Sequence, residues 1–176
     1  TITGVIRGTG ACVPERILDN KEIAGFVDTS DEWIRERTGV RRRRIAEKET
    51  TVSMACEAGR QAVEEAGILP GEIDMILVAT GSPDQIFPCT ACQVQEALGA
   101  DGAVGFDLNA ACSGFLFAYN TAQAYIASGI YRTVLVIGSE SISRLVDWTD
   151  RGTCILFGDG AGAVLLQAAE GKTYRP

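Results

Sequence analysis

The stretch Gly105-Phe-Asp-Leu-Asn-Ala-Ala-Cys-Ser-Gly-Phe115 joins a strand-like apolar segment to a helix-like one, with small residues and a thiol between them. After it the apolar residues recur every three or four positions, at Phe115, Tyr119, Ala122 and Ile126. This spacing is typical of one helix face, so Cys112 is predicted in or beside the first helical turn. Exposed N–H groups and the positive dipole end of a helix favour a thiolate there. The pattern therefore predicts a nucleophile at Cys112.

The neighbours of Cys112 are small, which leaves room for a carbonyl substrate to approach the sulfur. A buried structural cysteine at a strand-to-helix junction is the alternative, because free cysteine is among the most buried residue types. The chain contains no histidine, so a Ser-His-Asp or Cys-His arrangement cannot be built from it alone. Either the helix terminus activates Cys112 without an internal base, or the base lies on another polypeptide.

The composition is that of a globular chain, since 46% of the 176 residues are hydrophobic and 22% are charged. We interpret residues 1–176 as one domain of ordinary size, without a linker or repeat. No apolar run approaches the roughly 20 residues of a membrane span, and the first residues lack the features of a signal peptide. The sequence therefore predicts a cytoplasmic protein without membrane insertion.

The net charge is −7, which argues against a nucleic-acid partner. The basic charge is local, because six of the 16 basic residues lie between Arg35 and Arg44. A compact arginine patch beside an aromatic residue suits a phosphorylated small molecule or an acidic protein partner. For the run from Arg41 to Arg44, the alternative is a solvated turn or an edge strand that resists edge-to-edge pairing.

The six cysteines are spread through the predicted strands and helices, which favours reduced thiols over a disulfide framework. Cys89-Thr-Ala-Cys92 spells CxxC at the start of a predicted helix. One such pair without a second pair or a histidine is a weak zinc signal, and no metal site is predicted. A thioredoxin-like redox pair is another alternative, as are two cysteines that are simply neighbours on a helix.

Strand-like and helix-like segments alternate along the chain. Strands are predicted at Ile2–Cys12, Ile73–Ala79, Val104–Leu108, Val134–Gly138, Cys154–Phe157 and Gly162–Gln167. Helices are predicted at Asn20–Phe26, Ser30–Arg37, Thr51–Ala66, Thr90–Leu98 and Ser113–Ser128. Thr51 or Ser53 is the expected cap of the third helix, and Gly67 its end. The alternation favours an α/β protein with a mostly parallel sheet covered on both faces.

Two glycine patterns lack the residues of nucleotide-binding loops. Gly8-Thr-Gly10 is followed by Val13 where the third glycine of a dinucleotide fingerprint would stand, and Pro14 interrupts any helix. Phe157-Gly-Asp-Gly-Ala-Gly162 has no Lys-Ser or Lys-Thr pair. We interpret this second pattern as a glycine-rich turn with close backbone packing between two strands.

Several motifs appear in an order that resembles the first half of β-ketoacyl-acyl carrier protein synthase III, across essentially the whole chain. They are Val27-Asp-Thr-Ser-Asp-Glu-Trp33, Arg37-Thr-Gly39, Phe87-Pro88, the Cys112 segment, Asp150-Arg-Gly-Thr153 and Phe157–Gly162. The resemblance implies an α/β thiolase-like fold. The chain would form one βαβαβαββ half of a five-layered αβαβα sandwich, and the C-terminal half would be absent.

The resemblance also implies roles for particular residues. Cys112 matches the nucleophile that takes an acyl group from acyl-CoA before condensation with malonyl-acyl carrier protein, with acyl-CoA as a substrate and no cofactor. Trp33 matches the residue that stacks on the CoA adenine, with Arg151 opposite and with Thr29 and Arg37 nearby. Phe87 matches the residue that reaches across a homodimer to the neighbour's acyl pocket. The bland alternatives are a core anchor for Trp33, a salt bridge from Arg151 to Asp150 or Asp147, and local packing for Phe87.

In the family, a histidine and an asparagine that promote decarboxylation, and a glycine N–H of the oxyanion hole, lie in the second half. None has a match in this sequence. We therefore expect a complementary C-terminal half, produced by cleavage near Pro176 or supplied separately, and a chain that alone does not catalyse condensation. The alternatives are a related acyltransferase with another acceptor and a non-catalytic fragment that only dimerises.

Overall fold

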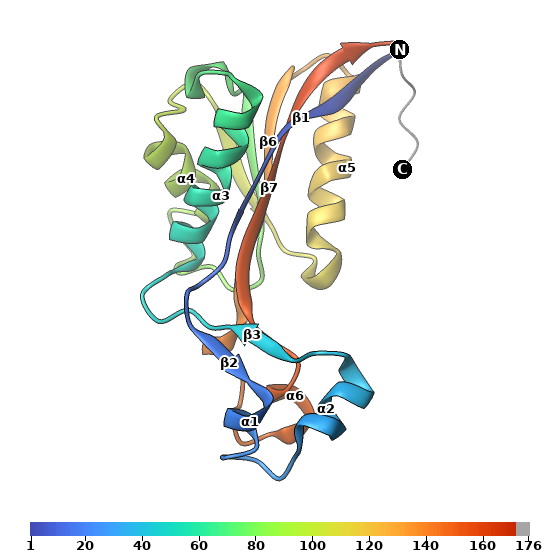
Figure 1. The fold of residues 1–176 in the computed structure, drawn as a ribbon. Coiled ribbons are helices and arrows are strands. Elements are labelled where there is room, and N and C mark those ends of the chain that lie inside the picture. Colours follow the sequence, from blue (N-terminus) through green and yellow to red (C-terminus); the bar gives the residue numbers. More distant parts are fainter. Residues whose placement is uncertain (172–176) are drawn as a thin grey trace.

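The computed structural model describes residues 1–171, which form a layered body above a smaller lobe (Figure 1). The body is built on a five-stranded sheet. Its strand order is β1 (Ile2–Cys12), β7 (Asp159–Glu170), β6 (Thr133–Ser141), β4 (Met75–Ala79) and β5 (Val104–Leu108). The helices α3 (Thr51–Ala66) and α4 (Thr90–Leu98) cover one face of this sheet, and α5 (Gly114–Ala127) covers the other.

The sheet is mixed, so the prediction of a mostly parallel sheet holds for only part of it. The pairs β6–β4 and β4–β5 are parallel, whereas β6–β7 and β7–β1 are antiparallel, with Ile2 opposite Glu170 at one end. The reason is that no crossover helix returns the chain between β6 and β7, so β7 runs back along its neighbour. The element order of the body nevertheless follows the expected βαβαβαββ sequence.

Two apolar clusters fix the layers on either side of the sheet. One lies under α3 and α4, and the other joins the sheet to α5 through Ala118, Ala122 and Ile126. Every residue of β4 is buried, which explains its uninterrupted apolar sequence at the centre of the sheet. The predicted sheet-facing residues of α5 are confirmed, since Phe115 and Tyr119 pack against the same cluster.

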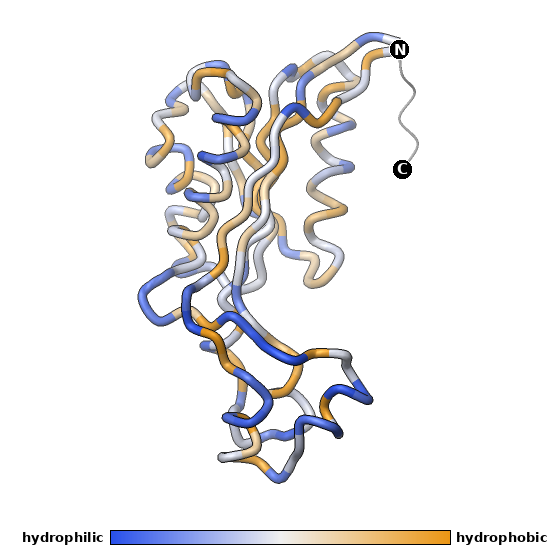
Figure 2. Tube along the Cα trace, in the orientation of Figure 1, coloured by the Kyte–Doolittle hydropathy of each residue, from blue (hydrophilic) through white to orange (hydrophobic). Residues whose placement is uncertain are grey.

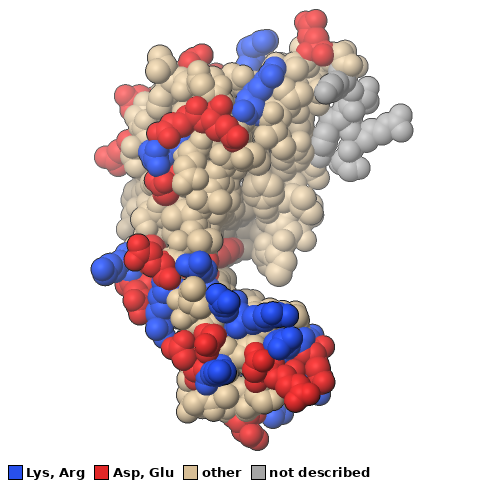
Figure 3. Space-filling model, in the orientation of Figure 1, with Lys and Arg blue, Asp and Glu red and all other residues tan. Residues whose placement is uncertain are grey.

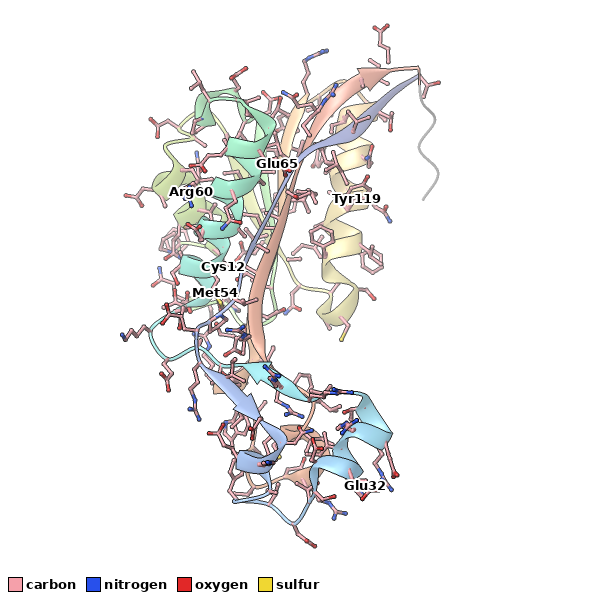
Figure 4. The ribbon with its side chains drawn as sticks, in the orientation of Figure 1. Cys12, Glu32, Met54, Arg60, Glu65 and Tyr119 are labelled. Atoms are coloured by element: carbon pink, nitrogen blue, oxygen red, sulfur yellow. The ribbon has the colours of Figure 1, made fainter. Side chains whose placement is uncertain are left out.

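The glycine pattern at Gly8 and Gly10 has a packing explanation. A Cβ atom at either position would lie 2.0 Å from a carbonyl oxygen of α3, so only glycine lets β1 approach this helix so closely. Glu65 of α3 accepts hydrogen bonds from the backbone N–H of Thr9 (2.5 Å) and from its hydroxyl (2.8 Å). Figure 4 shows Glu65 beside β1 and Tyr119 on α5, across the sheet.

Helix α3 has the predicted bounds, Thr51–Ala66, but its N-cap lies one residue before the predicted Thr51. Thr50 is the N-cap, and its hydroxyl accepts the N–H of Ser53 at 3.0 Å. Gly67 ends the helix, as predicted, with a φ of 69°, in the left-handed region that favours glycine. Gly39 ends α2 in the same way, with a φ of 72°. Thr90–Leu98 and Val104–Leu108 have the predicted bounds.

The smaller lobe is assembled from segments far apart in the sequence (Figure 1). It contains β2 (Ile17–Asp19), α1 (Asn20–Ile23), α2 (Asp31–Thr38), β3 (Arg42–Arg44) and α6 (Arg151–Cys154). Three one-turn 3-10 helices lie elsewhere, at Pro70–Glu72, Ala111–Ser113 and Ile142–Arg144. The lobe has its own apolar cluster, which is formed by Leu18, Ile23, Ile34, Cys154 and Ile155.

The predicted strand at Cys154–Phe157 is wrong, because Cys154 ends α6 and the second predicted strand belongs to the longer β7. Asp159, predicted in a turn, begins β7 and ties the sheet to the lobe. Its carboxylate accepts the N–H groups of Ala46 (2.7 Å) and Ser143 (2.9 Å), and also the Ser143 hydroxyl (2.5 Å). The predicted polar end of the chain lies largely outside the described residues.

The arginine run forms β3, which pairs with β2, so the run is a strand and not a solvated turn. Arg43 does not fit the expectation of a solvated side chain, because it is only 4% exposed. It donates to the backbone oxygen of Ile155 (3.0 Å from Nε) and to Asn20 Oδ1 (2.6 Å). Burial lowers the pKa of the Arg43 guanidinium. Figure 3 shows charged side chains gathered on this lobe, whereas the visible surface over α5 is mostly uncharged.

No helix among residues 1–171 is both long enough and apolar enough to cross a membrane.

Candidate active site

Cys112 lies in the single 3-10 turn between β5 and α5, and its side chain is exposed. The preceding residue, Ala111, has a φ of 47°, which is unusual for a residue other than glycine. Gly114 begins α5, and a Cβ there would lie 3.2 Å from the Cβ of Ala79 at the end of β4. This sharp turn presents the thiol at the start of α5, as the sequence predicts, and excludes the alternative of a buried structural cysteine.

Cys112 faces a cavity of about 710 Å³. Its wall is made of the ends of β4, β6 and β7, with small residues at Gly138, Gly160, Ala161 and Gly162. The glycine-rich segment that starts at Phe157 therefore lines the space in front of the sulfur, a role that the prediction of a packing turn missed. Small side chains keep this space open, because larger ones would fill it.

Glu140 is a cavity residue that the sequence analysis did not single out. Its Oε1 accepts the N–H of Gly81 at 2.8 Å, and its Oε2 accepts the hydroxyls of Thr80 (3.3 Å) and Ser82. The carboxylate thus holds the loop that follows β4 instead of reaching toward Cys112. A charged residue at the end of an otherwise apolar strand is the sequence signal that could have revealed it.

The aromatic and arginine residues predicted to bind a nucleotide come together on the lobe. Ser30 caps α2 by accepting the N–H of Trp33 at 3.1 Å, which fixes the position of this side chain. The guanidinium carbons of Arg37 and Arg151 lie 4.1 and 4.8 Å from the centroid of the Trp33 ring. Both distances are within the range of a cation–π contact.

Trp33 and Arg151 can also be compared with their structural alternatives. Trp33 is half-buried and packs against the apolar cluster of the lobe, so it anchors α2 as well as presenting a ring face. Arg151 donates to the backbone oxygen of Asp28 at 3.0 Å. Among the described residues it forms no ion pair with Asp150 or Asp147, so the salt-bridge alternative fails.

Thr29 lies beside this cluster with a buried hydroxyl. Its Oγ1 has no hydrogen-bond partner within residues 1–171. An unpaired buried hydroxyl costs folding free energy, so it is a candidate for pairing with a ligand. At the first residue of α2, the hydrogen bond from Asn20 (2.8 Å) lowers the pKa of the Asp31 carboxyl.

Phe87 lies away from the Cys112 cavity, in the loop that leads to α4. It is 89% exposed and its neighbour Ile86 is 92% exposed. Phe87 is not among the residues that line the cavity, so the structure does not bring it to the thiol of its own chain. The local-packing alternative fails, because its ring is almost entirely in solvent.

All six cysteines are free, and the Sγ atoms of Cys89 and Cys92 lie 3.5 Å apart. No group of three or more His, Cys, Asp or Glu side chains within the described part of the chain is arranged to hold a metal ion.

Comparison with known proteins gives consistent matches. The family model for 3-oxoacyl-[acyl-carrier-protein] synthase III matches residues 106–175. A β-ketoacyl-[acyl-carrier-protein] synthase III of Erythrobacter litoralis is 54% identical over 99% of this chain and 55% of its own length. The crystal structure of 3-oxoacyl-[acyl-carrier-protein] synthase III from Aquifex aeolicus superposes with a TM-score of 0.94 at 50% identity, over 96% of this chain and 55% of that one.

A second solved structure is similar in fold and sequence. The priming β-ketosynthase of the R1128 polyketide pathway has a TM-score of 0.93 and 41% identity, over 96% of this chain and 51% of that one. The chain spans about half the length of the curated relatives it matches. It is therefore a thiolase-fold protein, homologous over nearly its whole length to the β-ketoacyl-[acyl-carrier-protein] synthase III family.

Proposed function

We propose that this chain carries the nucleophile of a condensing enzyme that initiates fatty-acid synthesis in the cytoplasm. Cys112 would accept a short acyl group from acyl-CoA, and the acyl group would then condense with malonyl-acyl carrier protein. The observation that carries the proposal is the exposed Cys112 thiol, held after the left-handed Ala111 and facing an open cavity. The names of the homologues support the same activity.

The chemistry has two steps at the Cys112 sulfur. The thiolate attacks the thioester carbonyl of acyl-CoA, the carbon–sulfur bond to CoA breaks, and CoA leaves as its thiolate. Malonyl-acyl carrier protein then loses CO2, and the resulting carbanion attacks the acyl carbon, which releases Cys112 and gives a β-ketoacyl product. The backbone N–H of Cys112 is a donor for the tetrahedral oxyanion, and a second donor is required to complete the hole.

The cluster of Trp33, Arg37 and Arg151 supports CoA binding. If adenine lies between Trp33 and Arg151, it makes one stacked contact of about 3.5 Å with each of them. The Trp33 ring and the Arg151 guanidinium must then be about 7 Å apart. The present distance is 4.8 Å, so Arg151 would withdraw by about 2 Å when the purine enters. The buried, unpaired hydroxyl of Thr29 would then gain a polar partner on the ligand.

The outer face of α5 supports a complementary C-terminal half. Leu116 and Phe117 are 65% and 55% exposed on the side of α5 that faces away from the sheet, and Figure 2 shows hydrophobic residues along most of this helix. Large apolar side chains that lie exposed next to one another are typical of a surface that another polypeptide covers. The covering segment would also supply the histidine that this chain lacks and the second oxyanion donor.

The edge of the sheet supports a homodimer. Within residues 1–171, β5 pairs with β4 alone, and its Val104 and Phe106 are 44% and 38% exposed. An unpaired apolar strand edge is a template for pairing with another chain. Two copies joined at β5 would place the exposed Phe87 loop near the neighbouring subunit, where Phe87 would enter the acyl pocket.

Labelling with acyl-CoA tests the proposal. Incubation of the assembled protein with radioactive acetyl-CoA should leave one acid-stable acyl thioester, which peptide mapping should place on Cys112. Cys112→Ala should carry no label and should change the free energy of unfolding by less than about 0.5 kcal/mol, because the thiol is exposed. A protein without label would be a non-catalytic fragment. Label without malonyl condensation would indicate an acyltransferase with another acceptor.

A further inference from the structure

Cys89 and Cys92 form a close thiol pair that the proposed reaction does not use. Their Sγ atoms are 3.5 Å apart. A disulfide bond is about 2.05 Å long, so the sulfurs need to approach by only about 1.5 Å. Cys89 is the N-cap of α4, with extended backbone angles, and Cys92 lies three residues further on, in the first turn. The two side chains therefore meet across a single turn.

The backbone around the pair is held in place from two sides. The carboxylate of Asp107, on β5, accepts the N–H groups of Thr90 (2.9 Å) and Ala91 (2.8 Å). The carbonyl oxygen of Cys89 accepts the N–H of Cys92 at 3.1 Å. Because these hydrogen bonds fix the backbone of the first turn of α4, they hold the two sulfurs near one another.

The two sulfurs are not equivalent. The hydrogen bond with Cys89 raises the pKa of the Cys92 thiol, and burial and the negative charge of Asp107 raise it further. Cys89 precedes the first turn of α4 and directly follows the exposed segment 85–88, whereas Cys92 lies within that turn, so we assign the attacking role to Cys89.

We propose that Cys89 and Cys92 are a reversible dithiol–disulfide pair that exchanges with small-molecule disulfides of the glutathione type. Cys89 loses its proton and attacks one sulfur of the oxidant, whose disulfide bond breaks and releases one thiolate. Cys92 then loses its proton and attacks the sulfur of Cys89, which forms the protein disulfide and releases the second thiolate. The two cysteines are oxidised, the oxidant is reduced to two thiols, and those thiols take up the two protons.

A metal site at this pair is disfavoured by the same geometry. A zinc ion needs four ligands, and both oxygens of Asp107, an acidic group beside the pair, are already bonded to backbone N–H groups. The disulfide also has a mechanical consequence. Cys89 would move toward α4 and draw with it the exposed segment 85–88, which contains Phe87.

The test is a redox titration read by mass spectrometry. The protein is equilibrated with mixtures of reduced and oxidised glutathione, quenched in acid, unfolded and alkylated with N-ethylmaleimide. Cleavage at glutamate separates the peptide between Glu72 and Glu96, in which Cys89 and Cys92 are the only cysteines. After equilibration with oxidised glutathione, this peptide should carry no N-ethylmaleimide and should be two hydrogen atoms lighter than the dithiol peptide. Treatment with dithiothreitol before alkylation should give the peptide with two N-ethylmaleimide groups.

Three variants make the result specific. Cys92→Ser should leave a mixed glutathione disulfide on Cys89, because the resolving thiol is missing, whereas Cys89→Ser should react more slowly at Cys92. Cys56→Ser is the matched control, since Cys56 is also half-buried against the same core cluster, and it should leave the pair's titration unchanged. Circular dichroism checks that each variant is folded.

Two results would overturn the proposal. One is a peptide in which both cysteines stay alkylated at every glutathione ratio. The other is a peptide whose cysteines end in glutathione adducts, or in a bond to Cys112, instead of a bond to each other. Neither result depends on acyl transfer, so the redox pair and the condensing activity are tested separately.

Discussion

At the scale of single residues, Ala111 determines how Cys112 is presented. Its φ of 47° reverses the chain between β5 and α5, so that the next side chain points into the cavity. Residues other than glycine pay roughly 1–2 kcal/mol in this region because Cβ approaches the backbone. A backbone outlier beside a nucleophile is typical of functional sites, where the surrounding structure enforces it.

Substitution of Ala111 tests this interpretation. Ala111→Val should lower the free energy of unfolding by about 1–2 kcal/mol relative to Ala111→Gly, because a β-branched side chain is disfavoured at positive φ. It should also slow acylation of Cys112, as measured by labelling with acyl-CoA. Ala124→Val is the matched control, since Ala124 is an exposed residue of α5 whose backbone has no positive φ. Equal stabilities for Ala111→Val and Ala111→Gly would contradict the strained turn.

At the scale of elements, α2 and α6 meet at one aromatic ring although they are distant in sequence. Trp33 comes from α2, and Arg151 is the first residue of α6. Asp150 caps α6 by accepting the N–H of Gly152 at 2.9 Å, and this positions Arg151 over the ring. The cluster of Trp33, Arg37 and Arg151 therefore depends on two short helices that are stable only because the lobe packs them together.

Removing either partner of this stack should weaken the use of acyl-CoA. Trp33→Ala and Arg151→Ala should each reduce kcat/KM for acyl-CoA by about 5- to 150-fold, or about 1–3 kcal/mol. The rate of Cys112 alkylation by iodoacetamide should stay the same, because the thiol lies on another element. Trp148→Ala removes a tryptophan of the same lobe outside the stack. An equal loss in that variant would mean that unfolding of the lobe, not lost stacking, explains the effect.

The elements that could be predicted from sequence are those with local signals. Thr90–Leu98 and Val104–Leu108 were bounded correctly, because Gly99 ends the first in a left-handed conformation and an apolar run defines the second. The segment Cys154–Phe157 was wrongly predicted as a strand, since its apolar residues Cys154 and Ile155 pack into the lobe cluster and not into a sheet. Its packing partners are tertiary features that a local pattern does not contain.

The site was predictable to a similar extent. Cys112 and the Trp33 cluster could be found because chemically distinctive residues stand in distinctive surroundings. The left-handed turn at Ala111 could not, because alanine carries no signal for positive φ. Glu140 was also missed, since its hydrogen bonds to the loop after β4 join residues about sixty positions apart.

At the scale of the whole molecule, Asp84 makes the free energy of unfolding depend on pH in the acidic range. Burial raises the pKa of its carboxyl, but hydrogen bonds from the N–H of Val52 (2.8 Å) and from Arg144 (2.7 Å) outweigh this effect and lower the pKa overall. A group whose pKa is lower in the folded state adds stability above its unfolded pKa. For Asp84 that contribution is present above about pH 4 and is lost as the pH falls through the folded value.

Asp84→Asn should therefore destabilise the protein by about 1–3 kcal/mol at pH 7. The difference in unfolding free energy from the unsubstituted protein should shrink as the pH falls from 5 to 3, because the native carboxylate becomes protonated. Urea unfolding at a series of pH values measures it. A difference that stays constant over this range would show that the carboxylate charge contributes nothing.

Condensation is a property expected of the assembled molecule and not of this chain alone. The 176-residue chain, shown by mass spectrometry to be free of any companion fragment, should form no carbon–carbon bond from malonyl thioester, because it contains no histidine and, in our proposal, supplies only one of the two oxyanion donors. Adding the complementary half should restore the reaction, which should then depend on Cys112 in one chain and on a histidine in the other. Efficient condensation by the chain alone would contradict this division.

The position of β7 in the sheet has a consequence for the order of folding. β7 lies between β6 and β1, so the first strand pairs only with the last, and Ile2 meets Glu170. Until β7 inserts, β1 has no strand partner and rests only on helices, on α3 through the close contacts at Gly8 and Gly10 and on α5 through the hydrogen bond from the N–H of Gly4 to Gln123 (2.8 Å). Such long-range closure carries a large loop entropy and slows folding. The pairing of β1 with β7 should therefore be the late, rate-limiting event in refolding.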